Sequence, residues 1–142
     1  MANENKELAR RLIEELDKGN AAIFKQLCAA DFKLYVPGSS EPLSPEAATQ
    51  FVETFYNAFP DYSHRIEDVI AERDKVVVRC VNSGTHKDEY MGIPATGKSF
   101  EYGAIVILHI TDGKITEVWA QEDTMWMMEQ LGMELKPKEI GT

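Results

Sequence analysis

Long hydrophobic runs and an apolar leader are both absent from this sequence. The longest apolar stretch, Gly103 to Ile110, alternates and is far shorter than the roughly 20 residues that a membrane-spanning helix needs. The N-terminal residues MANENKELARR contain no apolar signal-peptide core. We therefore expect a cytoplasmic protein that makes no contact with a membrane.

Positive charge is also scarce. The 15 Lys and Arg residues stand against 24 Asp and Glu residues, which gives a formal net charge of −9, and no segment carries a stripe of Lys and Arg. A chain of this charge repels a phosphate backbone instead of displacing its counterions. Nucleic acid is therefore not an expected partner.

Cysteine is limited to Cys28 and Cys80, which lie on segments of different type and in no CxxC motif. Without a His-rich companion segment they indicate neither a metal site nor a disulfide framework. We interpret both as small buried hydrophobic residues, and we expect no metal and no cofactor.

The hydrophobic residues, 44% of the 142, follow first helical and then alternating periods, as in one domain. We expect a core over residues 5–132 and a tail over residues 133–142. Helical spacing predicts helices over residues 5–18, 21–30 and 124–131. A further helix is predicted from Pro45 to about Phe59, with Ser44 as its N-cap. Alternation of Val, Ile, Tyr and Thr with polar residues predicts strands over residues 32–36, 62–72, 75–85, 99–111 and 114–121.

This order of elements predicts an α+β fold. We expect a curved antiparallel sheet that wraps around the N-terminal helices and forms a cone with an apolar pocket at its mouth. The other face of the sheet is then free to pack against a second copy of the chain.

One formal motif is rejected because of its context. Residues 92–99, GIPATGKS, match the phosphate-binding pattern GxxxxGK[ST]. A P-loop needs a helix N-terminus directly after its lysine, whereas Lys98 and Ser99 lead into the alternating pattern of a strand. We interpret the segment as a connection between two strands.

The region around it, GTHKDEYMGIPATGKSFEY, resembles the SnoaL-like polyketide cyclases, and the similarity continues through FPD, DKVVVR, DGKI, EVW and EQLG to Gly132. The resemblance implies the cystatin-like cone shared with ketosteroid isomerase, scytalone dehydratase and nuclear transport factor 2, as a homodimer. It also implies an intramolecular aldol condensation without metal or Schiff base. In that reaction an Asp removes a proton alpha to carbonyl groups, and a His on the adjacent strand assists.

The residues that carry this chemistry are absent. Aligned on DGKI, the Asp of the family falls at Ala120 and its His at Val106. A type I turn with a glycine bulge over residues 111–113 would place Val106 opposite Val118, so that residues 106 and 120 share one face as diagonal neighbours. That even-numbered face is then wholly apolar and consists of Ala104, Val106, Leu108, Val118 and Ala120.

We therefore predict a pocket for a hydrophobic small molecule. Its expected ligand-binding residues are Tyr35, Phe55, Phe59, Val106, Val118, Ala120 and Trp126. The odd-numbered face, with Ile105, Ile107 and Trp119, is the expected homodimer interface.

A relocated acid or base has three candidates, His86, Tyr35 and Asp123. Each also has a structural interpretation: a loop hydrogen bond for His86, core packing for Tyr35, and the N-cap of the last helix for Asp123. His64 alternates with Tyr62 along a strand, so we expect it at an ordinary half-buried position.

Three functions remain open at this point. The first is a small-molecule-binding domain that lacks the catalytic pair of the family. The second is an isomerase, dehydratase or hydrolase of the same fold with a relocated acid/base group. The third is a non-catalytic dimerisation or interaction domain. An open cavity without ionisable groups favours the first, a buried carboxylate of raised pKa favours the second, and a filled cone favours the third.

Overall fold

The computed structural model describes residues 2–139, so residues 1 and 140–142, the latter the end of the expected tail, lie outside the described part. The described part contains four helices and five strands, with three of the helices before four consecutive strands and the last helix after them. In sequence they are α1 (Ala2–Asp17), α2 (Ile23–Leu27), β1 (Cys28–Tyr35), α3 (Pro45–Ala58), β2 (Ser63–Glu72), β3 (Lys75–Thr85), β4 (Ser99–Thr111), β5 (Lys114–Glu122) and α4 (Thr124–Gln130).

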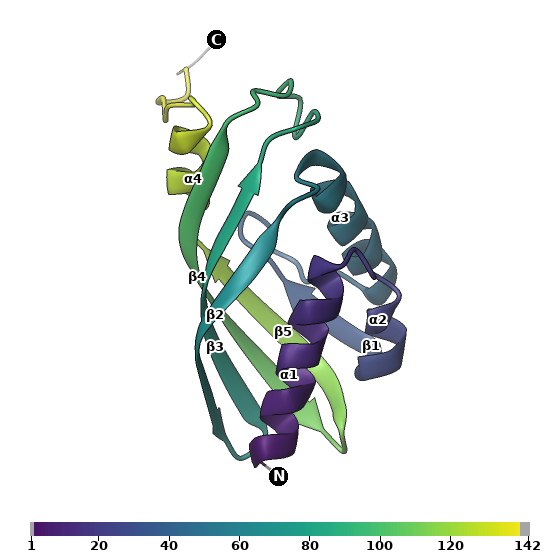
Figure 1. Cartoon of the computed structure of the whole chain (residues 1–142). Coiled ribbons are helices and arrows are strands. Elements are labelled where there is room, and N and C mark those ends of the chain that lie inside the picture. The colour runs from purple at the N-terminus through teal and green to yellow at the C-terminus, as the bar shows by residue number, and fades with distance from the viewer. Residues whose placement is uncertain (1, 140–142) are drawn as a thin grey trace.

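The strands form one sheet in the order β1-β5-β4-β3-β2. Neighbours pair antiparallel except β1, which runs parallel to β5 at the edge of the sheet. Helices α1, α2 and α3 lie on one side of the curved sheet, and α4 lies beside one end of β4 (Figure 1). The predicted fold class, a curved sheet around the N-terminal helices, is confirmed, although the parallel pairing of β1 was not foreseen.

Local sequence signals set several element boundaries. The Ser44 hydroxyl accepts a hydrogen bond from the backbone N–H of Ala47 at 3.2 Å, and Pro45 follows it at the first helical position. Strand β4 begins at Ser99, as the rejection of the P-loop requires. The start of α3 and the start of β4 are therefore determined by residues that are neighbours in the sequence.

The second helix is shorter than predicted. Helical spacing indicated residues 21–30, but α2 ends at Leu27 and Cys28 already belongs to β1. Cys28 pairs with Ile115 of β5, and a strand that gains a neighbour at the sheet edge outweighs a weak helical preference. The prediction for residues 28–30 is therefore wrong, because the competing partner is distant in sequence.

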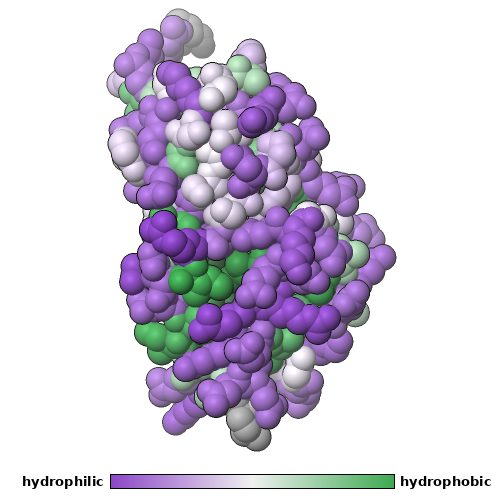
Figure 2. All heavy atoms as spheres, in the orientation of Figure 1, coloured by the Kyte–Doolittle hydropathy of each residue, from purple (hydrophilic) through white to green (hydrophobic). Residues whose placement is uncertain are grey.

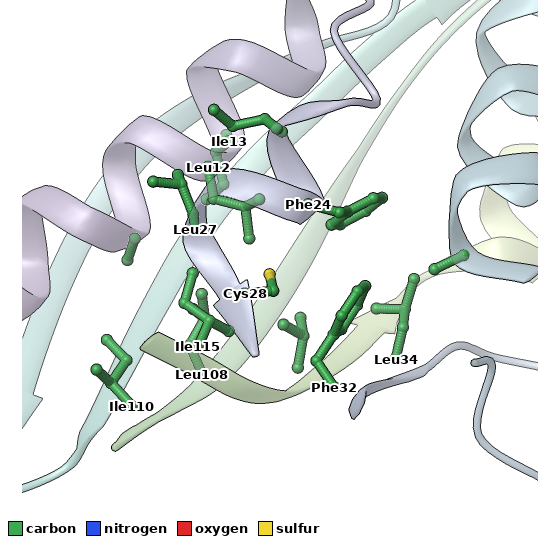
Figure 3. Close-up of a cluster of buried hydrophobic side chains, with 14 of the residues drawn as sticks. Leu12, Ile13, Phe24, Leu27, Cys28, Phe32, Leu34, Leu108, Ile110 and Ile115 are labelled. Atoms are coloured by element: carbon green, nitrogen blue, oxygen red, sulfur yellow. The ribbon is translucent and has the colours of Figure 1, made fainter. Parts of the chain in front are cut away.

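Two hydrophobic clusters hold the helices on the sheet. The larger cluster joins α1, α2 and β1 to the middle of the sheet, and Figure 3 shows Leu12, Phe24 and Phe32 converging in it. The smaller cluster joins the end of α3 to α4 and contains Phe59, Phe100 and Met127. The inner face of the sheet between α1 and α3 is thus enclosed by packed side chains.

The hairpin of β4 and β5 has a different register from the predicted one. Asp112 and Gly113 form a two-residue turn, both with positive φ (50° and 76°), as in a type I′ turn. The register shifts further along, between His109 and Ile110, where Thr116 of β5 is the extra residue. Val106 therefore lies directly opposite Ala120 instead of diagonal to it. Both still share the inner face.

The surface is hydrophilic over most of the view in Figure 2, where hydrophobic atoms gather in the lower half of the face that carries α1. Within residues 2–139, no helix combines the length and the apolar character that crossing a membrane requires.

Candidate functional site

A cavity of about 110 Å³ lies on the inner face of the sheet, under α1 and α3. Its walls are mostly apolar, and the polar groups among its lining residues are Tyr56, Tyr62, His64 and Glu122. The apolar lining residues are Leu12, Ile13, Leu16, Leu34, Val36, Phe51, Val52, Phe55, Val106, Leu108, Val118 and Ala120. A mainly hydrophobic cavity with a few polar groups is the usual form of a small-molecule site.

The residues predicted to bind a ligand are divided between this cavity and other places. Phe55, Val106, Val118 and Ala120 line it. The other three are not among its lining residues. Phe59 is fully buried in the smaller hydrophobic cluster. Trp126 lies on α4 and is 48% exposed.

The structure places Tyr35 on the opposite face of the sheet. Its ring stacks on Trp119 at a centroid distance of 5.5 Å, and its hydroxyl donates to Glu117 at 3.2 Å. Asp123 caps α4, because its carboxylate accepts from the backbone N–H of Trp126 at 3.1 Å. These contacts correspond to structural roles for both residues.

His86 is buried at the end of β3 and bonds to its own loop. Its Nδ1 lies 3.2 Å from the backbone N of Thr96 and 3.1 Å from the Thr96 hydroxyl. Nε2 is buried and has no hydrogen-bond partner within the described residues. The ring packs against Phe59 at 5.5 Å, so the structure does not bring His86 together with the cavity.

The imidazole that does reach the cavity belongs to His64 on β2. Its Nδ1 lies 2.7 Å from Oδ1 of Asp17, the last residue of α1. The backbone N–H of His64 donates to Oδ2 of the same carboxylate at 2.9 Å. Tyr56 of α3 donates its hydroxyl to Oδ1 at 2.8 Å. Asp17 therefore links both helices to the strand that carries the imidazole.

The ionisation of Asp17 fixes the tautomer of His64. Burial alone would raise the pKa of Asp17, but the hydrogen bonds and the charge of His64, with the Tyr56 bond, bring the pKa below its ordinary value. An ionised carboxylate can only accept, so Nδ1 of His64 carries a proton, and whenever the ring is neutral Nε2 carries the lone pair. Within residues 2–139, Nε2 makes no hydrogen bond. A ring nitrogen in this state can take a proton from a ligand.

The second polar group of the cavity is a carboxylate at the end of β5. Oε1 of Glu122 lies 3.0 Å from the Tyr62 hydroxyl and 2.9 Å from the Tyr102 hydroxyl. The amide of Asn82 lies 3.4 Å from the same oxygen. Burial, followed by the charge of Glu122, raises the pKa of Tyr62 and of Tyr102, so both phenols remain protonated donors.

Glu122 corrects the prediction of a wholly apolar inner face. Ala104 pairs with Glu122 across the hairpin, two residues beyond the pair of Val106 and Ala120. Along β5 every second residue lies on the inner face, so Glu122 follows Ala120 on that face. The strand prediction ended at Gln121, one residue too early, and for that reason the carboxylate was missed.

A larger groove of about 890 Å³ lies between β1 and α3. Charged side chains of both signs, Lys25, Glu46, Glu53 and Lys114, stand along an apolar floor. The lining of this groove contains no histidine, so no imidazole lies beside its carboxylates. Among the described residues, no group of three or more His, Cys, Asp or Glu side chains could hold a metal ion. The cavity under α1 and α3, which holds both an imidazole and a carboxylate, is therefore the better candidate for chemistry.

Asp17→Asn tests the link between α1 and β2. A carboxyl with a lowered folded-state pKa stabilises the fold above its ordinary pKa of 3.8 and loses that contribution as the pH falls through the lower value. We expect the variant to lose roughly 1–2 kcal/mol of unfolding free energy at neutral pH, since Asp17 is partly exposed. Urea unfolding should show that the difference from wild type shrinks below about pH 4. A difference that stays constant down to pH 2 would contradict this role.

A sheet curved around helices, with a mainly apolar cavity on its inner face lined by an imidazole and a carboxylate, is a cone-shaped α+β domain. The sequence profile of the SnoaL-like polyketide cyclases matches residues 6–131, and the chain belongs to this family.

Among its curated relatives is the aklanonic acid methyl ester cyclase DnrD of Streptomyces peucetius, 28% identical over 132 residues and 89% of each chain. The aklanonic acid methyl ester cyclase DauD of Streptomyces sp. (strain C5) is 30% identical over 135 residues, 89% of this chain and 80% of DauD. Among solved structures, IdmH of Streptomyces antibioticus matches with a TM-score of 0.80 at 29% identity, over 91% of this chain and 99% of IdmH.

Proposed function

We propose that this protein is an enzyme of the SnoaL-like family that carries out acid/base chemistry on a small hydrophobic carbonyl compound with a relocated base, His64. The observation that supports the proposal best is the hydrogen bond of 2.7 Å between His64 and Asp17 at the wall of the cavity. Of the three functions that the sequence left open, this is the isomerase, dehydratase or hydrolase with a moved acid/base group.

The proposed reaction begins with proton removal alpha to the carbonyl group. Nε2 of His64 takes the proton, and the carbon keeps the electron pair as an enolate. Asp17 stabilises the imidazolium that forms, as a carboxylate behind a catalytic histidine does in general. If the compound is β,γ-unsaturated, the imidazolium returns the proton to the γ-carbon, which completes an isomerisation. If it carries a second carbonyl group, the enolate carbon attacks that group and the imidazolium gives its proton to the alkoxide that forms, which completes a cyclisation.

The size of the cavity sets the size of the expected substrate. A volume of about 110 Å³ is slightly smaller than the roughly 150 Å³ cavity that accommodates benzene in an apolar core. We therefore propose a compound that places a single small ring, or a chain of similar volume, next to His64.

Exchange of α-protons in cyclopentanone tests the proposal directly. In D₂O, wild-type protein should exchange these protons faster than buffer alone, with saturation at high ketone concentration, as followed by the loss of their ¹H NMR signal. Ala120→Leu fills the cavity wall and should abolish the saturable exchange. Ala95→Leu, the same change at an exposed loop position, should leave the rate within about twofold, the scale of a surface substitution. Equal rates for wild type and Ala120→Leu would refute the proposal.

We also propose that the outer face of the sheet forms a homodimer. One apolar row crosses all five strands through the pairs Ile70–Val77, Val77–Ile107, Ile107–Trp119 and Trp119–Tyr35. Ile70 is 61% exposed, and Ile105, also predicted for the interface, is 47% exposed beside the row. A second copy of the same face is the occupant that would cover such a row symmetrically.

Ile107→Lys should convert the dimer to a monomer. The charge would lie at the centre of the apolar row, where a partner cannot hydrate it. Light scattering after gel filtration should report twice the monomer mass for wild type and the monomer mass for the variant. Leu135→Lys, at an 82% exposed position far along the chain, is the control and should remain dimeric. A monomeric wild-type protein at micromolar concentration would contradict the dimer.

A further inference from the structure

Glu122 has no cationic side chain beside it among the described residues. All three of its hydrogen-bond donors are neutral, and all three act on Oε1. Within residues 2–139, Oε2 accepts no hydrogen bond, and no Lys, Arg or His forms an ion pair with this carboxylate. The side chain of Glu122 is partly buried, and Oε2 is not among the fully buried polar atoms of the described residues. One carboxylate oxygen is thus left available at the cavity wall.

The rest of the cavity lining supplies no positive charge either. No Lys or Arg is among the lining residues, and the only imidazole, His64, is already held by Asp17. Both acidic groups of this region act in the same direction, because the charges of Asp17 and Glu122 both raise the pKa of Tyr56, after burial. A negatively charged ligand would meet the carboxylate of Glu122, with that of Asp17 behind His64 and no Lys or Arg in the lining.

Aromatic rings also line the cavity. Four of the lining residues are Phe51, Phe55, Tyr56 and Tyr62. The ring of Tyr62 meets that of Phe55 at 4.6 Å and that of Tyr56 at 5.6 Å, both edge to face. The face of an aromatic ring is negative, and a cation within about 6 Å of a ring centroid is attracted to it.

The side-chain oxygen of Asn82, next to Glu122, accepts no hydrogen bond from the described residues. Its Nδ2 donates to the Tyr62 hydroxyl at 2.7 Å and lies 3.4 Å from Glu122, while its Oδ1 is fully buried and has no partner among the described residues. Asn82 pairs with His64 on one side and Tyr102 on the other. Asn82 is not among the cavity lining residues, so its oxygen belongs to the buried network around Tyr62 and Glu122, and Oε2 of Glu122 remains the acceptor at the cavity wall.

We infer that the cavity takes a ligand with an ammonium group, which binds Oε2 of Glu122 while the adjoining rings surround its apolar part. The ligand is a small amine with a single ring or a short chain. This inference rests on the proposed function for the location of the site and adds the chemical class of the substrate: an amino-carbonyl compound whose acidic C–H lies toward His64 and whose ammonium group lies toward Glu122.

Cyclopentylamine and cyclopentanol are suitable probes, because they share one ring and differ in charge at neutral pH. Ligand-observed NMR titration of the wild-type protein should give a Kd for the ammonium compound at least about tenfold lower than for the alcohol. Glu122→Gln keeps the shape and removes the charge, and it should reduce this preference to less than about threefold. Glu129→Gln removes one charge from an exposed position on α4 and should retain the full preference.

Each outcome decides between the two proposals. Equal Kd values for the two probes in wild type would overturn the ammonium site, even if cyclopentanone exchange proceeds. The ammonium site would also be overturned if Glu129→Gln lowered the preference for the ammonium compound as much as Glu122→Gln does. The net charge of the protein alone would then explain the preference. Ammonium binding without any ketone exchange would support this ligand class and refute His64 as the base. The wild-type comparison stands even if Glu122→Gln fails to fold.

Discussion

His64→Gln should lower the rate of α-proton exchange in cyclopentanone by about 10²- to 10⁴-fold, the usual contribution of a general base. Glutamine keeps a polar group near Asp17 but has no basic nitrogen. The rate should fall while ligand binding persists, because the apolar lining of the cavity is unchanged. The decisive measurement is the saturated exchange rate in D₂O for wild type and variant at equal protein concentration.

The double variant His64→Gln, Asp17→Asn separates a positioned base from two independent effects. Asp17 acts through His64, so its loss should cost little more once the imidazole is gone. If the exchange rate of the double variant falls by the product of the two single-variant factors, Asp17 contributes to the rate independently of His64. If His64→Gln alone retains the wild-type rate, the base lies elsewhere, and Glu122 becomes the next carboxylate to replace.

Phe59→Ala should lower the free energy of unfolding by about 3–5 kcal/mol, the range for truncating a fully buried phenylalanine. Phe59 is 0% exposed and contacts the rings of Phe55, Tyr90 and Phe100 at 4.8, 5.1 and 5.2 Å. Its removal leaves an empty space between α3 and the loop before β4. Urea unfolding monitored by circular dichroism measures the loss.

Phe59→Leu is the matched control, since it retains most of the volume and should cost only about 1–1.5 kcal/mol. The pair of variants also tests where Phe59 acts. Because it lies in the smaller cluster and not among the cavity lining residues, Phe59→Leu should bind cyclopentylamine like wild type. A large loss of affinity in this stable variant would return Phe59 to the ligand-binding residues predicted from the sequence.

The fold was predictable wherever neighbouring residues determine the structure. Ser44 and Pro45 begin α3 as expected, and the strands β3 and β4 have the predicted bounds. The prediction failed at Cys28, whose strand conformation depends on pairing with Ile115, 87 residues away (115 − 28). It failed again at the β4–β5 turn, because Asp-Gly permits two turn types and the choice depends on a bulge further along the hairpin.

The candidate site was only partly predictable for a similar reason. Alternation placed Val106, Val118 and Ala120 on one face, and all three line the cavity. Continued to the next even position, the same pattern would have found Glu122. The partner of His64 had no signal in the sequence, because Asp17 ends an amphipathic helix among other charged residues and meets β2 only in the folded chain. A dyad formed by a helix end and a distant strand can be found only from the tertiary structure.

The bulge at Thr116 has a consequence for how this protein can change by insertion and deletion. It shifts the pairing of every later residue of β5 by one position, so that Val118, Ala120 and Glu122 lie on the inner face. A deletion of one residue there would exchange the two faces of the strand. Trp119 and Gln121 would then enter the cavity, and the carboxylate would move to the outer face. The chemical character of the cavity therefore depends on the length of the hairpin as well as on the side chains that line it.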